Sequence, residues 1–423
     1  MKISYKTKDY CEVLALPRKK HKKPKRINMF FRSLLWLVSR PDLIKTHFEY
    51  ERCGIEKWGR KEPALVLMNH SSFIDLEILS TLLYPRPFNI LTTTDAFIGK
   101  EWLMRTIGCV PTKKFIHDTT LLRDMRYCVD KLKSSVVLFP EASYSFDGTA
   151  TPLPDTVAKL VKLFKLPVIM ISTEGAFHRD PLYNNIQVRK VKVKAKEEYL
   201  LSPKEAESLS VEEIDRILKE KFSFDNFRWQ QENSVRVDEK TRADFLNRVL
   251  YKCPHCGVEG KMLGKGEYIG CENCKKSYKL TEYGFLEATD GDGRFTHVPD
   301  WYRWEREEVR REIEAGTYSL DVAVDIMVAV DLKTLYKVGE GRLIHNLQGF
   351  TLDVCSGKLH FTEKPLSSYS LYSDFNWYEI GDVISIGNQN IQYYCFPKGE
   401  GGHDVVAKAR LAVEEMYKLI SER

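Results

Sequence analysis

Four short apolar runs, separated by segments with helical spacing, constrain the fold of this chain more than any other feature. The runs cover residues 64–68, 88–94, 135–139 and 166–172. Between them, segments such as FIDLEILSTLLY and LLRDMRYCVDKLK place apolar residues three and four positions apart, which is typical of helices. Continuous apolar runs indicate strands buried on both faces, and their alternation with helices favours a mostly parallel sheet. We therefore predict an α/β domain with helices covering the sheet.

Polar side chains follow two of these predicted strands. The first run leads into Asn69 and His70, and the third leads into Pro140 and Glu141. Because ligands gather at the carboxyl ends of parallel strands, we expect His70 and Glu141 to emerge at the same functional edge of the sheet.

The spacing between His70 and Asp75 suggests a catalytic pair. If Ser72 caps the next helix, Asp75 lies in the first turn, and its side chain points back toward the His70 ring. The amino end of the helix disfavours an imidazolium and keeps His70 neutral, while Asp75 orients the ring for proton transfer. Ser72-x-x-Asp75 also fits a capping box, so structural roles for Asp75 and His70 remain open.

Four blocks of sequence carry a family resemblance. NHSSFID from Asn69, GCVPTKKF from Gly108, LFPEASYS from Leu138 and LPVIMI from Leu166 resemble, in order and spacing, the glycerolipid acyltransferases, which include 1-acylglycerol-3-phosphate acyltransferase. The resemblance covers roughly residues 50 to 225. It implies transfer of a fatty acyl group from acyl-CoA or acyl-ACP, the acyl carrier protein thioester, to a lysolipid hydroxyl. His70 would deprotonate the hydroxyl, which attacks the thioester directly.

Two blocks depart from the family pattern, and both concern acceptor binding. The second block usually ends in arginine, where this chain has Lys113 and Lys114; a lysine neutralises phosphate but lacks the bidentate fork, and a solvated basic surface is the alternative. The third block is usually Phe-Pro-Glu-Gly-Thr-Arg-Ser. Here Glu141 is retained, Ser143 takes the threonine position and Tyr144 takes the arginine position. The resemblance implies substrate binding by these five residues, with an acceptor other than lysophosphatidic acid, such as a lysophospholipid with a larger headgroup.

Two Cys-x2-Cys pairs, separated by 14 residues, predict a metal site: Cys253, Cys256, Cys271 and Cys274. Such pairs present four thiolates tetrahedrally, as zinc prefers, and four protein ligands leave no open position for catalysis. We therefore expect a structural zinc ribbon, with rubredoxin-like iron as the alternative. Acidic residues among its lysines argue against nucleic-acid binding. A role in docking domains or in gripping an acyl carrier protein is favoured instead.

The amino-terminal region combines a basic run with an amphipathic helix. The net charge of +6 is due to seven basic residues within positions 18–26: Arg18, Lys19, Lys20, Lys22, Lys23, Lys25 and Arg26. The apolar residues that follow form one helical face, which we expect to end at Pro41: Ile27, Phe30, Phe31, Leu34, Leu35 and Val38. This face is too short to cross a bilayer but suits an anionic membrane surface. Packing on the core, a solvated tail and nucleic-acid binding are the alternatives.

The start of the chain lacks the apolar core of a signal peptide, and no apolar stretch is long enough to span a membrane. We therefore expect a cytoplasmic protein that is peripheral on the cytoplasmic face of a membrane.

The carboxyl-terminal third changes to short alternating runs typical of antiparallel strands. A charged helix from Asp300 to Gly316 precedes them, and a helix with an apolar face of Val406, Ala409, Val413, Met416 and Ile420 closes the chain. The pattern resembles a pleckstrin-homology or GRAM-like module that binds a lipid headgroup or a partner, although a scaffold packed on the enzyme would look the same.

These observations predict six segments: a basic tail and membrane-surface helix (1–48), an acyltransferase domain (49–225), a connector (226–250), a zinc ribbon (251–290), a linker helix (291–318) and a β-rich domain (319–423). The leading interpretation is a membrane-associated O-acyltransferase. The alternative is a catalytically inactive lipid-binding adaptor, because the arginine of the third block is lost.

Overall fold

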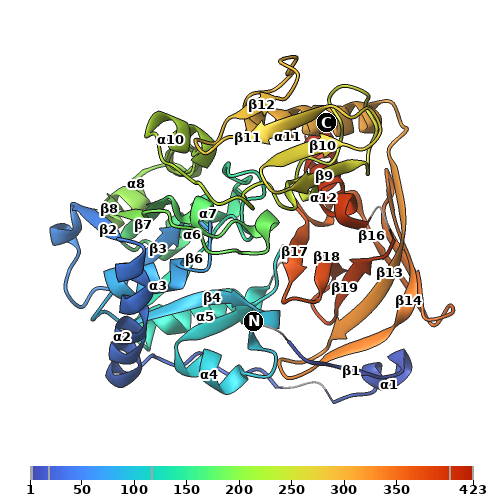
Figure 1. Cartoon of the computed structure of the whole chain (residues 1–423). Helices are drawn as coiled ribbons and strands as arrows, with labels where there is room; N and C mark the ends of the chain where they lie inside the picture. Colours follow the sequence, from blue (N-terminus) through green and yellow to red (C-terminus); the bar gives the residue numbers. More distant parts are fainter. Residues whose placement is uncertain (1–2, 18–19, 116–117, 400–401, 422–423) are drawn as a thin grey trace.

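The computed structural model describes residues 3–17, 20–115, 118–399 and 402–421. Within these residues the chain forms three sheets: a seven-stranded sheet, a four-stranded sheet and an eight-stranded sheet. Figure 1 shows the seven-stranded sheet in the blue and green part of the chain and the eight-stranded sheet in the orange and red part. The α/β domain, the ribbon and the β-rich region predicted from the sequence are therefore all present.

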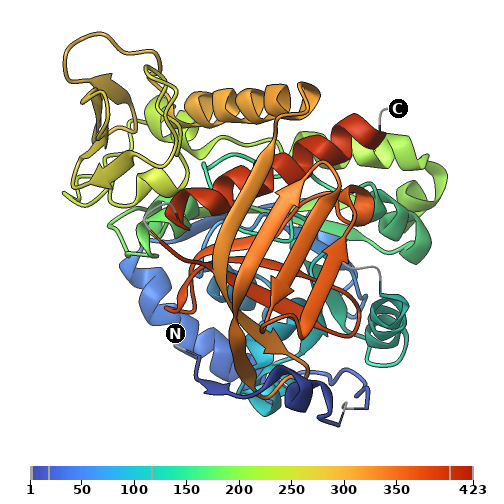
Figure 2. The same ribbon diagram turned by 90° about the vertical axis from the view of Figure 1, so that its right-hand side faces the viewer.

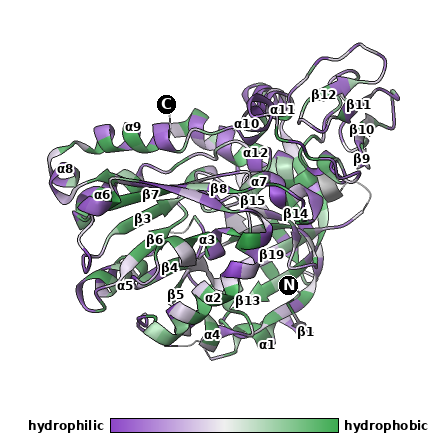
Figure 3. Ribbon diagram, turned by 60° about the vertical axis from the view of Figure 1, so that its left-hand side comes forward, coloured by the Kyte–Doolittle hydropathy of each residue, from purple (hydrophilic) through white to green (hydrophobic). Residues whose placement is uncertain are grey.

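The seven-stranded sheet has the order β2-β8-β7-β3-β6-β4-β5. All neighbouring strands are parallel except β7 and β8. The strands are β2 (Glu49–Cys53), β3 (Leu65–Met68), β4 (Phe88–Thr93), β5 (Cys109–Thr112), β6 (Ser135–Leu138), β7 (Val168–Glu174) and β8 (Lys194–Leu201). The four predicted strands are confirmed as β3, β4, β6 and β7, and the central ones are coloured hydrophobic in Figure 3.

Side chains of β3 alternate between two hydrophobic cores, one on each face of the sheet. Val66 and Met68 belong to one core, whereas Leu65 and Leu67 belong to the other. Helices α2 (Met29–Lys45) and α3 (Asp75–Leu82) cover the first face. The second face is covered by α5 (Thr119–Asp130), α6 (Thr156–Phe164) and α9 (Val211–Lys221). A strand buried on both faces explains why its sequence is continuously apolar.

Shorter helices complete this part of the molecule: α4 (Glu101–Thr106), α7 (Ala176–Arg179), α8 (Pro203–Ser208) and α10 (Asn226–Glu232). Single 3₁₀ turns lie at η1 (Ile55–Lys57), η2 (Thr94–Phe97), η3 (Leu182–Asn184), η4 (Leu246–Arg248) and, in the last third of the chain, η5 (Pro365–Ser367).

Helix α2 differs from the prediction at its carboxyl end. It continues through Pro41 to Lys45 instead of ending at the proline. A proline removes one helical hydrogen bond, but the last turn buries Leu43 in the core, which favours continuing the helix. Within the described ranges, no helix combines the length and the apolar character needed to cross a bilayer.

The four-stranded sheet is antiparallel, with the order β12-β11-β10-β9. Its strands are β9 (Met262–Lys265), β10 (Tyr268–Cys271), β11 (Ser277–Leu280) and β12 (Leu286–Ala288). Helix α11 (Val298–Glu314) follows and starts two residues before the predicted Asp300. Figure 3 colours α11 mostly hydrophilic, in agreement with its charged sequence.

The eight-stranded sheet contains a meander of four strands and a meander of three, joined because β13 pairs with β19. Its strands are β13 (Ser319–Ala329), β14 (Leu335–Asn346), β15 (Gly349–Val354), β16 (Leu359–Glu363), β17 (Tyr372–Trp377), β18 (Gly381–Gly387), β19 (Gln392–Pro397) and, outside the two meanders, β1 (Tyr5–Thr7), which pairs with β14. Helix α12 (Gly402–Ser421) lies across one end of this sheet, as Figure 2 shows. The predicted apolar face is buried at Val406, Ala409, Val413 and Met416, whereas Ile420 is exposed.

The amino-terminal segment is packed against the protein, whereas the sequence suggested a tail. Strand β1 (Tyr5–Thr7) pairs in parallel with β14, and after α1 (Tyr10–Leu14) the chain returns to the first domain. There Lys22 forms an ion pair with Glu101. Arg18 and Lys19 of the basic run lie outside the described residues. The difference arises because a three-residue strand pairs with a partner remote in sequence, which leaves no local signal.

Candidate active site

His70 and Asp75 form a hydrogen-bonded pair at the carboxyl end of β3. The distance from His70 Nδ1 to Asp75 Oδ2 is 2.9 Å, and the same oxygen accepts hydrogen bonds from the backbone N–H groups of Ser71 (3.1 Å) and Ser72 (3.2 Å). Asp75 is buried, whereas 22% of the His70 side chain is exposed. Because an ionised carboxylate only accepts hydrogen bonds, Nδ1 carries the proton and Nε2 is left as the acceptor.

The local cause of this pairing differs from the predicted cap. Helix α3 begins at Asp75, and the Ser72 hydroxyl accepts a hydrogen bond from the Ile74 N–H group (3.3 Å) instead of capping the helix. Residues 72–74 therefore form a turn, and this turn places the Asp75 carboxylate next to the His70 imidazole.

Two aromatic rings enclose the His70 imidazole. The ring centroid of Phe139 lies 4.2 Å from that of His70, and the centroid of Tyr144 lies 4.0 Å away in a stacked arrangement. Burial raises the pKa of Tyr144 well above its usual range, so its hydroxyl stays neutral. Tyr144 therefore orients the imidazole and supplies no charge to the site.

Glu141 connects two loops beneath His70. One carboxylate oxygen accepts a hydrogen bond from the His70 backbone N–H group (3.0 Å), and the other accepts one from the Thr151 N–H group (3.0 Å). Burial raises the pKa of Glu141 to about 7, although these hydrogen bonds oppose the rise. The structure thus shows Glu141 holding the backbone of His70, and its predicted contact with substrate stays a prediction.

The two lysines of the second block have different surroundings. Lys113 Nζ donates to the carbonyl groups of Asn388 (3.2 Å) and Gln389 (2.6 Å), in the turn between β18 and β19. Lys114 Nζ lies 4.2 Å from the ring centroid of Tyr372 on β17, and burial lowers its pKa. Both contacts join the second block to the eight-stranded sheet.

A cavity of about 1880 Å³ is lined both by the domain of the seven-stranded sheet and by the last third of the chain. Its lining includes His70, Asp75, Lys113, Lys114 and Tyr144. Beside His70 and the lysines, the acyltransferase domain contributes apolar side chains to the lining, including Leu91, Leu121, Leu138, Leu153 and Leu160. The last third of the chain contributes polar and aromatic side chains, including Tyr372, Asp374, Trp377, Tyr378 and Arg410. The apolar side chains suit an alkyl chain, and the polar ones suit a headgroup.

Sequence reasoning missed the contribution of the last third to this cavity. Ser143, a predicted substrate contact, accepts a hydrogen bond from Arg410 of α12 (2.9 Å). One signal pointed to α12: Arg410 and Glu414 are spaced as an ion pair beside a face that was predicted to be buried.

Comparison with known proteins agrees with this geometry. Residues 50–174 match the family model described as Acyltransferase. The chain is 26% identical over 117 residues to 1-acyl-sn-glycerol-3-phosphate acyltransferase BAT2, chloroplastic, of Brassica napus, an alignment that covers 27% of this chain and 33% of that protein. It is 29% identical over 118 residues to LPAT1, chloroplastic, of Arabidopsis thaliana, an alignment that covers 26% and 32%. Residues 50–174 thus form a domain that is similar to acyltransferases.

This acyltransferase domain spans about a third of the length of the curated relatives that it matches. A solved structure, the 1-acyl-sn-glycerophosphate (LPA) acyltransferase PlsC from Thermotoga maritima, is 18% identical with a TM-score of 0.35, and the match covers 45% of this chain and 78% of that one. The range that matches the family model, residues 50–174, includes His70 and Asp75.

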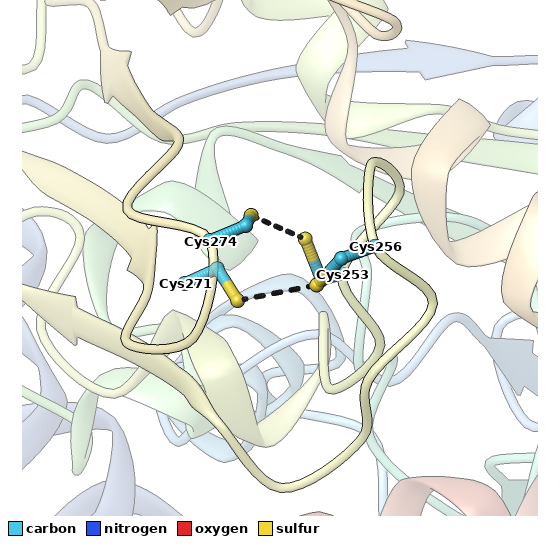
Figure 4. A group of neighbouring side chains, drawn as sticks. All are labelled: Cys253, Cys256, Cys271 and Cys274. Carbon is cyan, nitrogen blue, oxygen red and sulfur yellow. Dashed lines mark hydrogen bonds between the residues drawn. The ribbon is translucent and has the colours of Figure 1, made fainter.

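The four predicted cysteine ligands form a compact cluster in the ribbon, shown in Figure 4. Their Sγ atoms all lie within 4.8 Å of one another, with 3.6 Å between Cys253 and Cys274 and 3.8 Å between Cys256 and Cys271. Sulfur ligands about 2.3 Å from a tetrahedral zinc ion are about 3.8 Å apart, so the cluster fits such an ion. His255 lies beside the cluster and hydrogen-bonds to the Tyr278 hydroxyl (2.8 Å).

Proposed function

We propose that the protein transfers a fatty acyl group from a thioester, acyl-CoA or acyl-ACP, to the hydroxyl group of a lysophospholipid-like acceptor. The observation that carries this proposal is the His70–Asp75 pair in the lining of a cavity that has an apolar wall. The match of residues 50–174 to the acyltransferase model supports it.

In the proposed reaction, Nε2 of His70 takes the proton of the acceptor hydroxyl while the oxygen attacks the thioester carbonyl. The carbon–sulfur bond then breaks, and the imidazolium returns the proton to the leaving thiolate. Asp75 stabilises the imidazolium through the hydrogen bond from Nδ1–H. The rings of Phe139 and Tyr144 restrict the rotation of the imidazole. The entropy cost of orienting the base is therefore met when the protein folds and not during the reaction.

Transfer assays test the proposal directly. The protein is incubated with acyl-CoA or acyl-ACP, labelled in the acyl chain, and with lysophosphatidic acid, other lysophospholipids or monoacylglycerol. We expect label in a diacyl product and release of one thiol per acyl group. An inactive adaptor, the alternative function, binds lipid and transfers label to none of these acceptors.

We also propose that the protein works on an anionic membrane surface on the cytoplasmic face. Helix α2 packs on the core through Phe31 and Leu35, but Phe30 is 68% exposed and Leu37 is 59% exposed. Trp102 of α4 is 69% exposed and lies edge-on to Phe31, with 6.4 Å between ring centroids, so it extends the same apolar surface. The exposed part of the basic run, from Lys20 to Arg26, leads directly into α2. Apolar side chains beside cationic ones match the chemistry of an anionic leaflet.

Replacing both Phe30 and Leu37 by glutamate is expected to abolish sedimentation with vesicles that contain phosphatidylglycerol. The wild-type protein should bind these vesicles, lose binding as salt is raised, and bind weakly to neutral phosphatidylcholine vesicles. Leu263→Glu is the matched control, because Leu263 is also exposed but lies on β9 of the ribbon. Equal binding by the double variant and the wild-type protein would refute a membrane role for α2.

A further inference from the structure

The third block of the acyltransferase domain lacks a cation of its own, because Tyr144 stands at the arginine position and stacks on His70. Burial raises the pKa of its phenol well above the usual range, so this residue supplies no charge. A phosphate-bearing acceptor therefore needs a positive charge from elsewhere in the cavity.

Arg410 brings a guanidinium group to the backbone of this block. From helix α12, Nη2 of Arg410 donates to Ser143 Oγ (2.9 Å) and Nη1 donates to the Tyr144 carbonyl (3.3 Å). The guanidinium also lies 4.3 Å from the ring centroid of Phe146. Arg410 is 3% exposed and belongs to the lining of the cavity that contains His70. Arg410 of α12 thus places a positive charge beside the backbone carbonyl of Tyr144, the residue that stands where the family has arginine.

The hydrogen bonds of Arg410 leave capacity for a ligand. Nε donates to Glu414 (3.2 Å), so three of the five N–H groups of the guanidinium have partners among the described residues. Glu414 is shared with Arg306, whose Nη2 lies 2.7 Å from it. Although burial opposes ionisation, Arg306 and Arg410 lower the pKa of Glu414 to about 2. Arg306 also forms an ion pair with Glu415 (3.0 Å), so Glu414 is not its sole partner, and both arginines line the cavity.

The two lysines of the second block lie elsewhere in the lining. Lys114 lies over Tyr372, while Lys113 is held by the turn between β18 and β19. Asp374 also lines the cavity, and burial raises its pKa to about 7 although the charge of Lys114 opposes the rise. Both blocks that the family uses for the acceptor are therefore in contact with the last third of the chain.

We infer that Arg410 is a specificity-determining residue that binds the phosphate of the acceptor, so that the headgroup is held between the acyltransferase domain and helix α12. The inference rests on the proposed function. Phosphate monoesters and diesters share the chemistry that a guanidinium recognises, and an uncharged acceptor lacks it.

Steady-state kinetics of Arg410→Gln test this inference. Glutamine keeps a polar group near Ser143 but removes the charge. We expect the KM for lysophosphatidic acid or lysophosphatidylglycerol, whichever the wild-type protein uses, to rise about 10- to 100-fold, because hydrogen bonds to charged groups contribute this much. The kcat and the KM for acyl-CoA should change less than about twofold, and Arg410→Lys should recover part of the loss, since lysine keeps the charge without the fork.

The matched control is Arg310→Gln. Arg310 pairs with Glu415 and Glu314 in the same group of ion pairs between α11 and α12, but it lies outside the described lining of the cavity. The Arg310→Gln variant should leave the acceptor KM unchanged. The thermal unfolding temperatures of both variants show whether either substitution destabilises the fold.

Three kinetic results would overturn the inference. They are an unchanged acceptor KM in a folded Arg410→Gln protein, an equal loss for phosphate lipids and monoacylglycerol, and a wild-type protein that prefers monoacylglycerol. Calorimetric binding of glycerol 3-phosphate separates this inference from the proposed function. If the wild-type protein transfers no acyl group, the proposed function is wrong. Binding of glycerol 3-phosphate to the wild-type protein that is lost in Arg410→Gln would still support the phosphate site. Equal binding to both proteins, or binding to neither, overturns the inference.

Discussion

Replacing His70 by alanine is expected to lower kcat for acyl transfer by about 10²- to 10⁴-fold, the usual contribution of a positioned general base. The reason is specific to the geometry: the imidazole is held by Asp75 at 2.9 Å and by two flanking rings, and alanine leaves no group to accept the hydroxyl proton. Release of thiol from acyl-CoA in the presence of a lysolipid acceptor measures the effect.

A second variant shows whether the loss is chemical. The backbone of His70 is held by Glu141 through its N–H group, and this contact survives the removal of the side chain. His70→Ala should therefore unfold at nearly the same temperature as the wild-type protein and bind acyl-CoA with similar affinity. His70→Gln fills the same space between the rings and should be equally inactive. A folded alanine variant with full turnover would remove His70 from the mechanism.

Removing the metal from the ribbon is expected to be the most destabilising change. We propose that the four cysteines bind one structural zinc ion, since their sulfur atoms have the tetrahedral spacing and leave no open position. Structural zinc in small ribbons contributes on the order of 10 kcal/mol to folding, so Cys253→Ser or a strong chelator should unfold the ribbon. Elemental analysis should find one zinc per chain, and differential scanning calorimetry should show a lower unfolding temperature.

The effect should extend to the active site. Glu259 of the ribbon forms an ion pair with Lys408 of α12 (2.8 Å), two residues before Arg410. Loss of the ribbon therefore loosens the helix that supplies the cation to the third block, and the acceptor KM should rise together with the loss of zinc. Cys53→Ser is the control, because it removes a thiol outside the cluster. Visible absorption typical of iron–thiolate bonding in the purified protein would instead indicate iron.

Much of the acyltransferase domain could be predicted because its signals are local. Strand β3 is continuously apolar since both of its faces are buried, and the spacing between His70 and Asp75 was enough to expect their contact. Strand β5 was missed because its sequence, Cys109 to Thr112, is short, contains a proline and is only half buried. The helix start at Asp75 was misplaced, since Ser72 looks like a cap in sequence but forms a turn.

Contacts between distant segments could not be predicted. Arg410 is one arginine in a helix with an apolar face, and only the folded chain shows that its guanidinium reaches Tyr144. Likewise, the sequence does not distinguish Lys113 from Lys114. In the structure, Lys113 donates to the Asn388 carbonyl and Lys114 lies over the ring of Tyr372. Such pairings depend on how the domains pack, which no short motif encodes.

The pairing of β1 with β14 has a consequence for biosynthesis. Tyr5–Thr7 leaves the ribosome more than three hundred residues before its partner, Leu335–Lys337, has been translated. During that interval the start of the chain has no edge to join, while the neighbouring amphipathic helix is already complete. The segment Tyr5–Thr7 therefore waits for β14, and the first strand of the chain is among the last to be added to its sheet.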